Sequence, residues 1–89
     1  MFSGFIDGLL EYAKPQATRE EKLARMLEAV GWLRDETVYF GEDDEDYTFR
    51  QMDELALEIR ARAQLLGGEP KELLLDVASL IAASMSRKN

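Results

Sequence analysis

Apolar residues recur with a helical period along most of the chain, and the strongest pattern lies in residues 69–86. There they cover most of the circumference of a helical projection. A helix that is apolar nearly all round is a buried one, so we expect this segment to be central and covered on two or three sides. Gly67 and Gly68 end the preceding segment, and Pro70 suits the first helical position. The apolar positions are Leu73, Leu74, Val77, Ala78, Leu80, Ile81, Ala82 and Met85.

Two further segments are predicted to be helices that begin with capping signals. Thr18 and Glu21 form a capping box in front of a helix over residues 18–36, and Thr48 and Gln51 form another in front of residues 48–66. Each has an apolar stripe that can pack along the helix at 70–86. The first stripe is Leu23, Met26, Leu27, Val30 and Leu33; the second is Phe49, Met52, Ala56, Ile59, Ala63 and Leu66.

The remaining segments are a short helix and a loop. Residues 3–13 have one apolar face, and Pro15 stops this helix. Gly4 and Gly8 would permit another backbone to approach it closely. Residues 37–47 break the helical pattern, because valine and aromatic residues favour extended structure and Gly41 ends it. We predict an ordered loop here, or alternatively a small hairpin with residues 47–49.

The chain is therefore predicted to be one all-α domain over residues 1–89. We expect a small four-helix bundle with helices near 3–13, 18–36, 48–66 and 70–86, and an acidic loop between the second and third. The short connections at 14–17 and 67–69 favour antiparallel neighbours. So short a chain has little core, and oligomerisation is a common remedy. We expect a homodimer whose interface is Leu57, Ala61 and Leu65 with the first helix, although this second apolar face could also pack inside the fold.

Charge is concentrated in one short stretch. The net charge of the chain is −7, and residues 35–46 hold seven acids and no base. Direct binding to nucleic acid is disfavoured, because phosphate contacts need a basic footprint. An acidic surface instead steers association towards a basic partner protein.

Composition argues against catalysis. The chain has no histidine and no cysteine, so it lacks the commonest general base, the commonest transition-metal ligand and any thiolate. The acidic run 42–46 lacks the spacing of a calcium loop. We predict no enzyme activity, no cofactor and no metal. No apolar run is long enough to span a membrane, and we expect a cytoplasmic protein.

Aromatic residues flank the acidic run and define a predicted binding surface. Trp32 projects with charged residues on the helix, so it is either covered by a neighbouring segment or exposed as an anchor for a partner. We predict a non-catalytic interaction or regulatory module. The alternative is an acidic mimic of nucleic acid that inhibits a nuclease or a defence system, of the anti-restriction, anti-CRISPR or immunity type. The predicted partner-binding residues are Trp32, Tyr39, Phe40, Glu42, Asp43, Asp44, Glu45, Asp46 and Tyr47.

Overall fold

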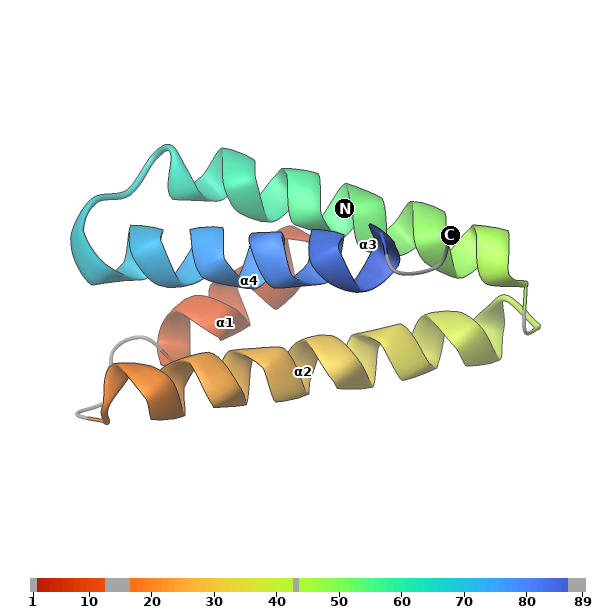
Figure 1. Cartoon of the computed structure of the whole chain (residues 1–89), viewed down its shortest axis with the longest axis horizontal. Coiled ribbons are helices and arrows are strands. Elements are labelled where there is room, and N and C mark those ends of the chain that lie inside the picture. Colours follow the sequence, from red (N-terminus) through yellow and green to blue (C-terminus); the bar gives the residue numbers. More distant parts are fainter. Residues whose placement is uncertain (1, 13–16, 43, 87–89) are drawn as a thin grey trace.

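The computed structural model of the chain describes residues 2–12, 17–42 and 44–86. These residues form four helices and no strand: α1 (Ser3–Tyr12), α2 (Arg19–Phe40), α3 (Glu45–Ala63) and α4 (Gly68–Ser86). The predicted small all-α four-helix bundle is thus confirmed. In Figure 1 the three long helices lie side by side, α3 antiparallel to α2 and to α4, while the shorter α1 crosses behind them. No helix in the described part is long and apolar enough to cross a membrane.

The centre of the fold is the contact between α3 and α4. The seam predicted on α3 is buried at Met52, Ala56, Ile59 and Ala63, and Leu55 joins it. These side chains meet the buried face of α4, and Met26 and Val30 of α2 close the core. Truncating a fully buried leucine in such a core costs about 2–5 kcal/mol. The buried residues of α4 are Leu73, Leu74, Val77, Ala78 and Ile81.

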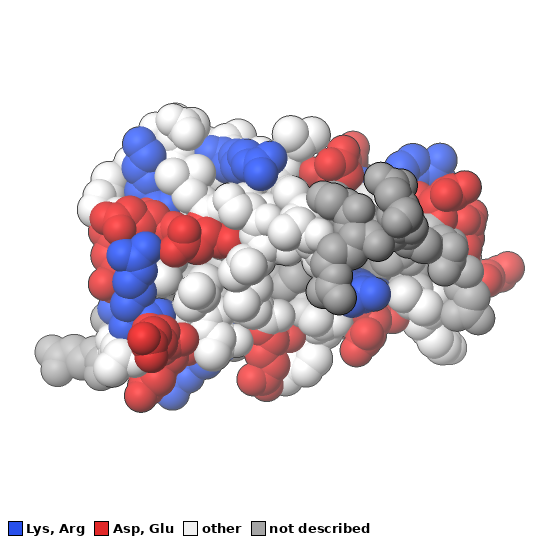
Figure 2. Space-filling view, viewed as in Figure 1, with Lys and Arg blue, Asp and Glu red and all other residues white. Residues whose placement is uncertain are grey.

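The last helix is less enclosed than its composition predicts. Leu80 is 44% exposed, and Ser79, Ala83 and Ser84 are exposed beside it. The reason is geometric: α2 and α3 flank α4, and α1 lies behind them, so none of the helices in the described residues covers the front of α4 (Figure 1). Much of the front face in Figure 2, where α4 lies foremost, is uncharged. The predicted coverage of α4 on two or three sides is thus found, but Leu80, one of its predicted apolar positions, lies on the open side.

The predicted loop over residues 37–47 is mostly helix, and the hairpin alternative is wrong as well. α2 continues to Phe40, and α3 begins at Glu45. Thr37 is buried, and its hydroxyl donates to the carbonyl of Arg34 at 2.7 Å. Burial of Thr37 and continued backbone bonding outweigh the low helix propensity of this segment.

The helix starts follow one capping prediction and contradict the other. Thr18 caps α2, with its hydroxyl accepting from the backbone N–H of Glu21 at 3.1 Å. The second cap is Asp44, not Thr48: its carboxylate accepts from the N–H groups of Asp46 and Tyr47 at 3.0 and 3.3 Å. Aspartate at this position is an equally good cap, and it starts the helix a turn earlier.

The turn between α2 and α3 has two unusual residues. Glu42 has φ 54°, in the left-handed region that glycine favours. At Gly41 a Cβ would overlap the ring of Tyr47 and lie 2.9 Å from the carbonyl oxygen of Thr37. Only glycine therefore lets Tyr47 pack on the backbone of the turn. The predicted end of the first helix, at Pro15, lies outside the described residues.

Two glycine-to-alanine substitutions in α2 and its turn should change stability in opposite directions. At Gly31 a Cβ meets nothing within 4 Å, so Gly31→Ala should raise the free energy of unfolding by about 0.5–1 kcal/mol. Gly41→Ala should lower it by about 1–3 kcal/mol, because Tyr47 must move. Urea unfolding followed by circular dichroism measures both, and equal effects of the two changes would contradict the packing of Tyr47.

Candidate interaction surface

Three large aromatic side chains lie exposed along the outer face of α2. Trp32 is 60% exposed, Tyr39 76% and Phe40 72%. The positions follow i, i+7 and i+8 spacing, which places them on one helical face. The rings of Tyr39 and Phe40 are in edge-to-face contact, with centroids 5.2 Å apart. Of the two alternatives for Trp32, coverage by a neighbouring segment is wrong: the indole is exposed.

Beside Trp32, α1 and α2 enclose an open groove of about 280 Å³, here called the α1–α2 groove. Its lining is mostly apolar, and Glu36 supplies the one charged group among the described residues that line it. Nothing lies within 4 Å of a Cβ built at Gly8, so the glycine leaves the groove open on the α1 side. The groove is lined by Phe5, Gly8, Leu9, Ala29, Trp32, Leu33 and Glu36.

Two polar contacts with α3 hold α1 in the position that forms the groove. The backbone N–H of Phe2 donates to the Glu58 carboxylate at 2.9 Å, and Arg62 binds Asp7 at 2.6 Å. Ile6 and Leu9 of α1 are buried in the core. The hydrogen bond from Phe2 lowers the pKa of Glu58, against the opposing effect of burial, because it favours the ionised carboxylate.

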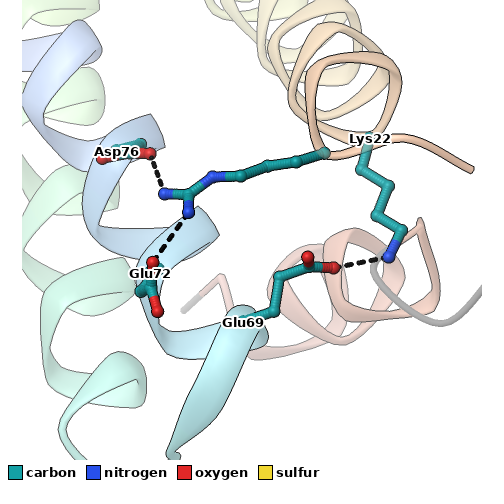
Figure 3. A network of polar contacts seen from close by, with 5 residues as sticks. Lys22, Glu69, Glu72 and Asp76 are labelled. Atoms are coloured by element: carbon teal, nitrogen blue, oxygen red, sulfur yellow. Dashed lines mark hydrogen bonds and ion pairs between the residues drawn. The ribbon is translucent and has the colours of Figure 1, made fainter.

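At the end of the bundle where α2 and α4 begin, acidic side chains form ion pairs with bases of the same chain. Arg19, in the first turn of α2, binds Glu72 at 2.7 Å and Asp76 at 2.9 Å on α4. One turn on, the nearly buried Lys22 binds Glu69 (Figure 3). The guanidinium donates hydrogen bonds to both carboxylates, and these raise the pKa of Arg19. The bond to Asp76 has the larger effect and the bond to Glu72 the smaller. These contacts fix how the start of α2 sits against the start of α4.

Carboxylates near the exposed aromatic residues have no such partners. Asp35, Glu36, Glu42 and Asp46 are exposed, and none of them forms an ion pair within the described part of the chain. Asp35 and Glu36 lie one turn from Trp32, and Glu42 follows Phe40 by two residues. We call the exposed set Trp32, Asp35, Glu36, Tyr39, Phe40 and Glu42 the acidic–aromatic surface.

Part of the predicted acidic run has a structural role. Asp44 caps α3, and Asp46 lies in its first turn, where negative charge is favourable. Tyr47 is half-buried, with its ring against Gly41. Asp43 and the side chain of Glu45 lie outside the described part. The run of acids is therefore partly a signal for the start of a helix, which weakens it as a sign of binding.

The face predicted as a dimer interface is exposed. Leu57 is 57% exposed and Leu65 80%, and Ala61 is exposed between them on α3. Packing of this face inside the fold, the other possibility, is wrong. Whether a second copy covers it stays a prediction.

The groove itself was not anticipated from the sequence. Gly4 and Gly8 were expected to admit another backbone, yet nothing lies within 4 Å of a Cβ at either position. The available signal was a glycine on the first helix and a tryptophan on the charged side of the second. Turning that signal into a groove requires the crossing of α1 over α2, which the sequence pattern does not specify.

Chemical function is not indicated by any cluster of side chains in the described part. No group of three or more acidic residues there is placed to hold a metal ion. Comparison with known proteins finds no significant match to a family model, a curated protein or a solved structure.

The contact between Phe2 and Glu58 should make stability depend on pH. A carboxylate whose folded pKa is lowered stabilises the fold above its unfolded pKa, and this contribution disappears as the pH falls through the folded value. Glu58→Gln should therefore reduce the free energy of unfolding by about 1 kcal/mol near neutral pH. The difference from wild type should shrink as the pH falls below the ordinary value of 4.5.

Urea unfolding of both proteins across this acid range measures that difference. Glu54→Gln, which changes an exposed carboxylate one turn earlier on α3, is the matched control and should alter stability little. A deficit in Glu58→Gln that stays the same at all pH values would contradict the assignment.

Proposed function

We propose that the protein is a non-catalytic protein-binding module whose acidic–aromatic surface binds a partner protein with a basic surface. The observation that carries this proposal is the exposure of Trp32, Tyr39 and Phe40 on one face of α2, beside carboxylates without ion-pair partners in the described residues. A small bundle with little core gains nothing in stability from leaving three aromatic rings in water.

The two components of the surface have separate roles in binding. Tryptophan and tyrosine are enriched among the residues that dominate interface energies, because they bury large areas at low entropic cost. Asp35, Glu36 and Glu42 supply a negative potential that draws a basic partner and speeds its association. Such a surface combines an apolar anchor with a charged rim.

A nucleic-acid-mimicking inhibitor is the second candidate function, and the exposed unpaired carboxylates favour it. A mimic depends on the carboxylates that stand in for phosphates, so salt and free DNA should both displace its target. An aromatic anchor loses less of its affinity as salt rises. We favour the binding module because the aromatic rings occupy the same helical face as Glu36.

We also propose that the chain is a homodimer through the exposed face formed by Leu57 and Ala61 of α3 and Leu65 of the turn that follows it. This face lies on a different helix from the acidic–aromatic surface, so a dimer could bind two partners at once. Its support is the exposure of Leu57 and Ala61 one turn apart on α3, followed by the exposed Leu65 in the turn after the helix.

The binding module is tested by capture of partners from lysate of the source organism. The aromatic variant Trp32→Ala/Tyr39→Ala/Phe40→Ala and the charge variant Asp35→Asn/Glu36→Gln/Glu42→Gln should each retain less of a basic protein than wild type. Both variants change exposed side chains and should fold normally. A matched control, Asp53→Asn/Glu54→Gln, changes two exposed carboxylates on α3 outside both proposed surfaces and should capture as much as wild type.

Two results would replace the proposal. Loss in the charge variant alone, together with competition by DNA, would establish the mimic instead. Equal capture by all four proteins would show that the acidic–aromatic surface binds nothing in the lysate.

The dimer is tested by light scattering after gel filtration. Wild type should have twice the mass of one chain, and Leu57→Glu/Leu65→Glu should return to the monomer mass, because four charges would face each other across a two-fold interface. A monomer at high wild-type concentration would rule out the dimer.

A further inference from the structure

We propose that the α1–α2 groove takes an apolar side chain from a basic amphipathic helix of the partner protein, which lies along the exposed face of α2. This inference rests on the proposed function and specifies the chemistry of the partner. In this arrangement the groove anchors the partner helix, and Tyr39 and Phe40 form a second contact with it. The carboxylates of the acidic–aromatic surface form the charged rim of the site.

The size and lining of the groove fit a side chain. About 280 Å³ of open, mostly apolar space accommodates one bulky aliphatic or aromatic group. Trp32 forms one wall and Gly8 leaves the opposite wall without a side chain, so the space is open to a group arriving from outside. Because Glu36 is the one charged residue in the described lining, the entering group is apolar and its neighbours can be basic.

A helical partner fits the layout of α2. α1 has 10 residues and α2 has 22, so α1 can lie along less than half of the length of α2. Trp32 and Tyr39 are two turns apart, about 10 Å along the axis. A helix that packs along α2 presents apolar anchors at i, i+3 or i+4, and i+7, which have the same spacing.

Charge selects the partner helix. Asp35 and Glu36 are exposed along the same part of α2, and Glu42 is exposed in the turn after it. None of the three has an ion-pair partner within the described residues. Arg25 is exposed on the same helical face two turns before Trp32. Arg34 is exposed on α2 between Trp32 and Tyr39, so the three acids outnumber the one base in this part of the chain. The potential next to the aromatic rings is therefore negative, and lysine or arginine on the flanks of the apolar anchors complements it.

The chain offers a matched pair of variants that test the groove. Gly8→Leu places a side chain in the groove, and Gly4→Leu places the same side chain one turn away, outside the lining. Both glycines are exposed helical positions where a Cβ meets nothing within 4 Å, so both variants should fold at least as well as wild type. Melting curves of both establish that before binding is measured.

The probe is a phage-displayed library of helical peptides without tryptophan, each about 18 residues long because shorter helices are marginal in water. After selection on wild type, enriched peptides should be basic and carry apolar residues at i, i+3 or i+4, and i+7. Trp32 is the one tryptophan in the chain, so a blue shift of its emission reports occupation of the groove. Gly8→Leu should weaken binding by at least about tenfold, and Gly4→Leu by less than about twofold.

Each other outcome overturns the inference in an identifiable way. Peptides that bind Gly8→Leu as well as wild type but fail on the charge and aromatic variants would remove the groove and leave the proposed function standing. Failure to enrich a basic peptide, or peptides that bind all variants equally, would remove both. A wild-type dimer that Gly8→Leu dissociates would mean that a second copy of this chain occupies the groove.

Discussion

The burial of one face of α4 against α3 is the constraint on which the rest of the structure depends. Leu73, Leu74, Val77 and Ala78 lose all contact with water, and the α3 side chains opposite them are buried to the same degree. α2 then packs against this pair through Met26 and Val30, and α1 closes the back. A chain of this length cannot bury every apolar residue that a long amphipathic helix carries. The outer aromatic residues of α2 are the part that the core does not use.

Polar contacts between helices set the relative positions that the apolar core leaves free. Arg19 and Lys22 tie the first turns of α2 to α4, and Glu58 and Arg62 tie α1 to α3. Surface ion pairs add little stability, but they restrict how one helix slides along another. The division of charge that results is informative: acids at the start of α4 are paired, whereas those around Tyr39 and Phe40 have no ion-pair partner among the described residues.

The helices and their buried faces could be predicted from the sequence because the apolar period is local information. The segment around Val38 was mispredicted because propensity favours extended structure there, while the burial of Thr37, a tertiary effect, maintains the helix. Asp44 and Thr48 are both good caps, and the sequence pattern does not rank them. The helical projection already placed Trp32 with charged residues. The groove beside it depends on the path of α1 over α2, which arises only in the folded chain.

The central claim is that the α1–α2 groove and the acidic–aromatic surface form one binding site for a basic helix. The most direct measurement is a two-dimensional ¹H–¹⁵N NMR titration with a selected basic peptide. The Trp32 indole N–H and the Gly8 amide should shift together and saturate at the same peptide concentration, while the Gly67 amide, beyond the far end of α3, stays in place. Shifts that spare Gly8 and Trp32, or that spread evenly over all four helices, would contradict the claim.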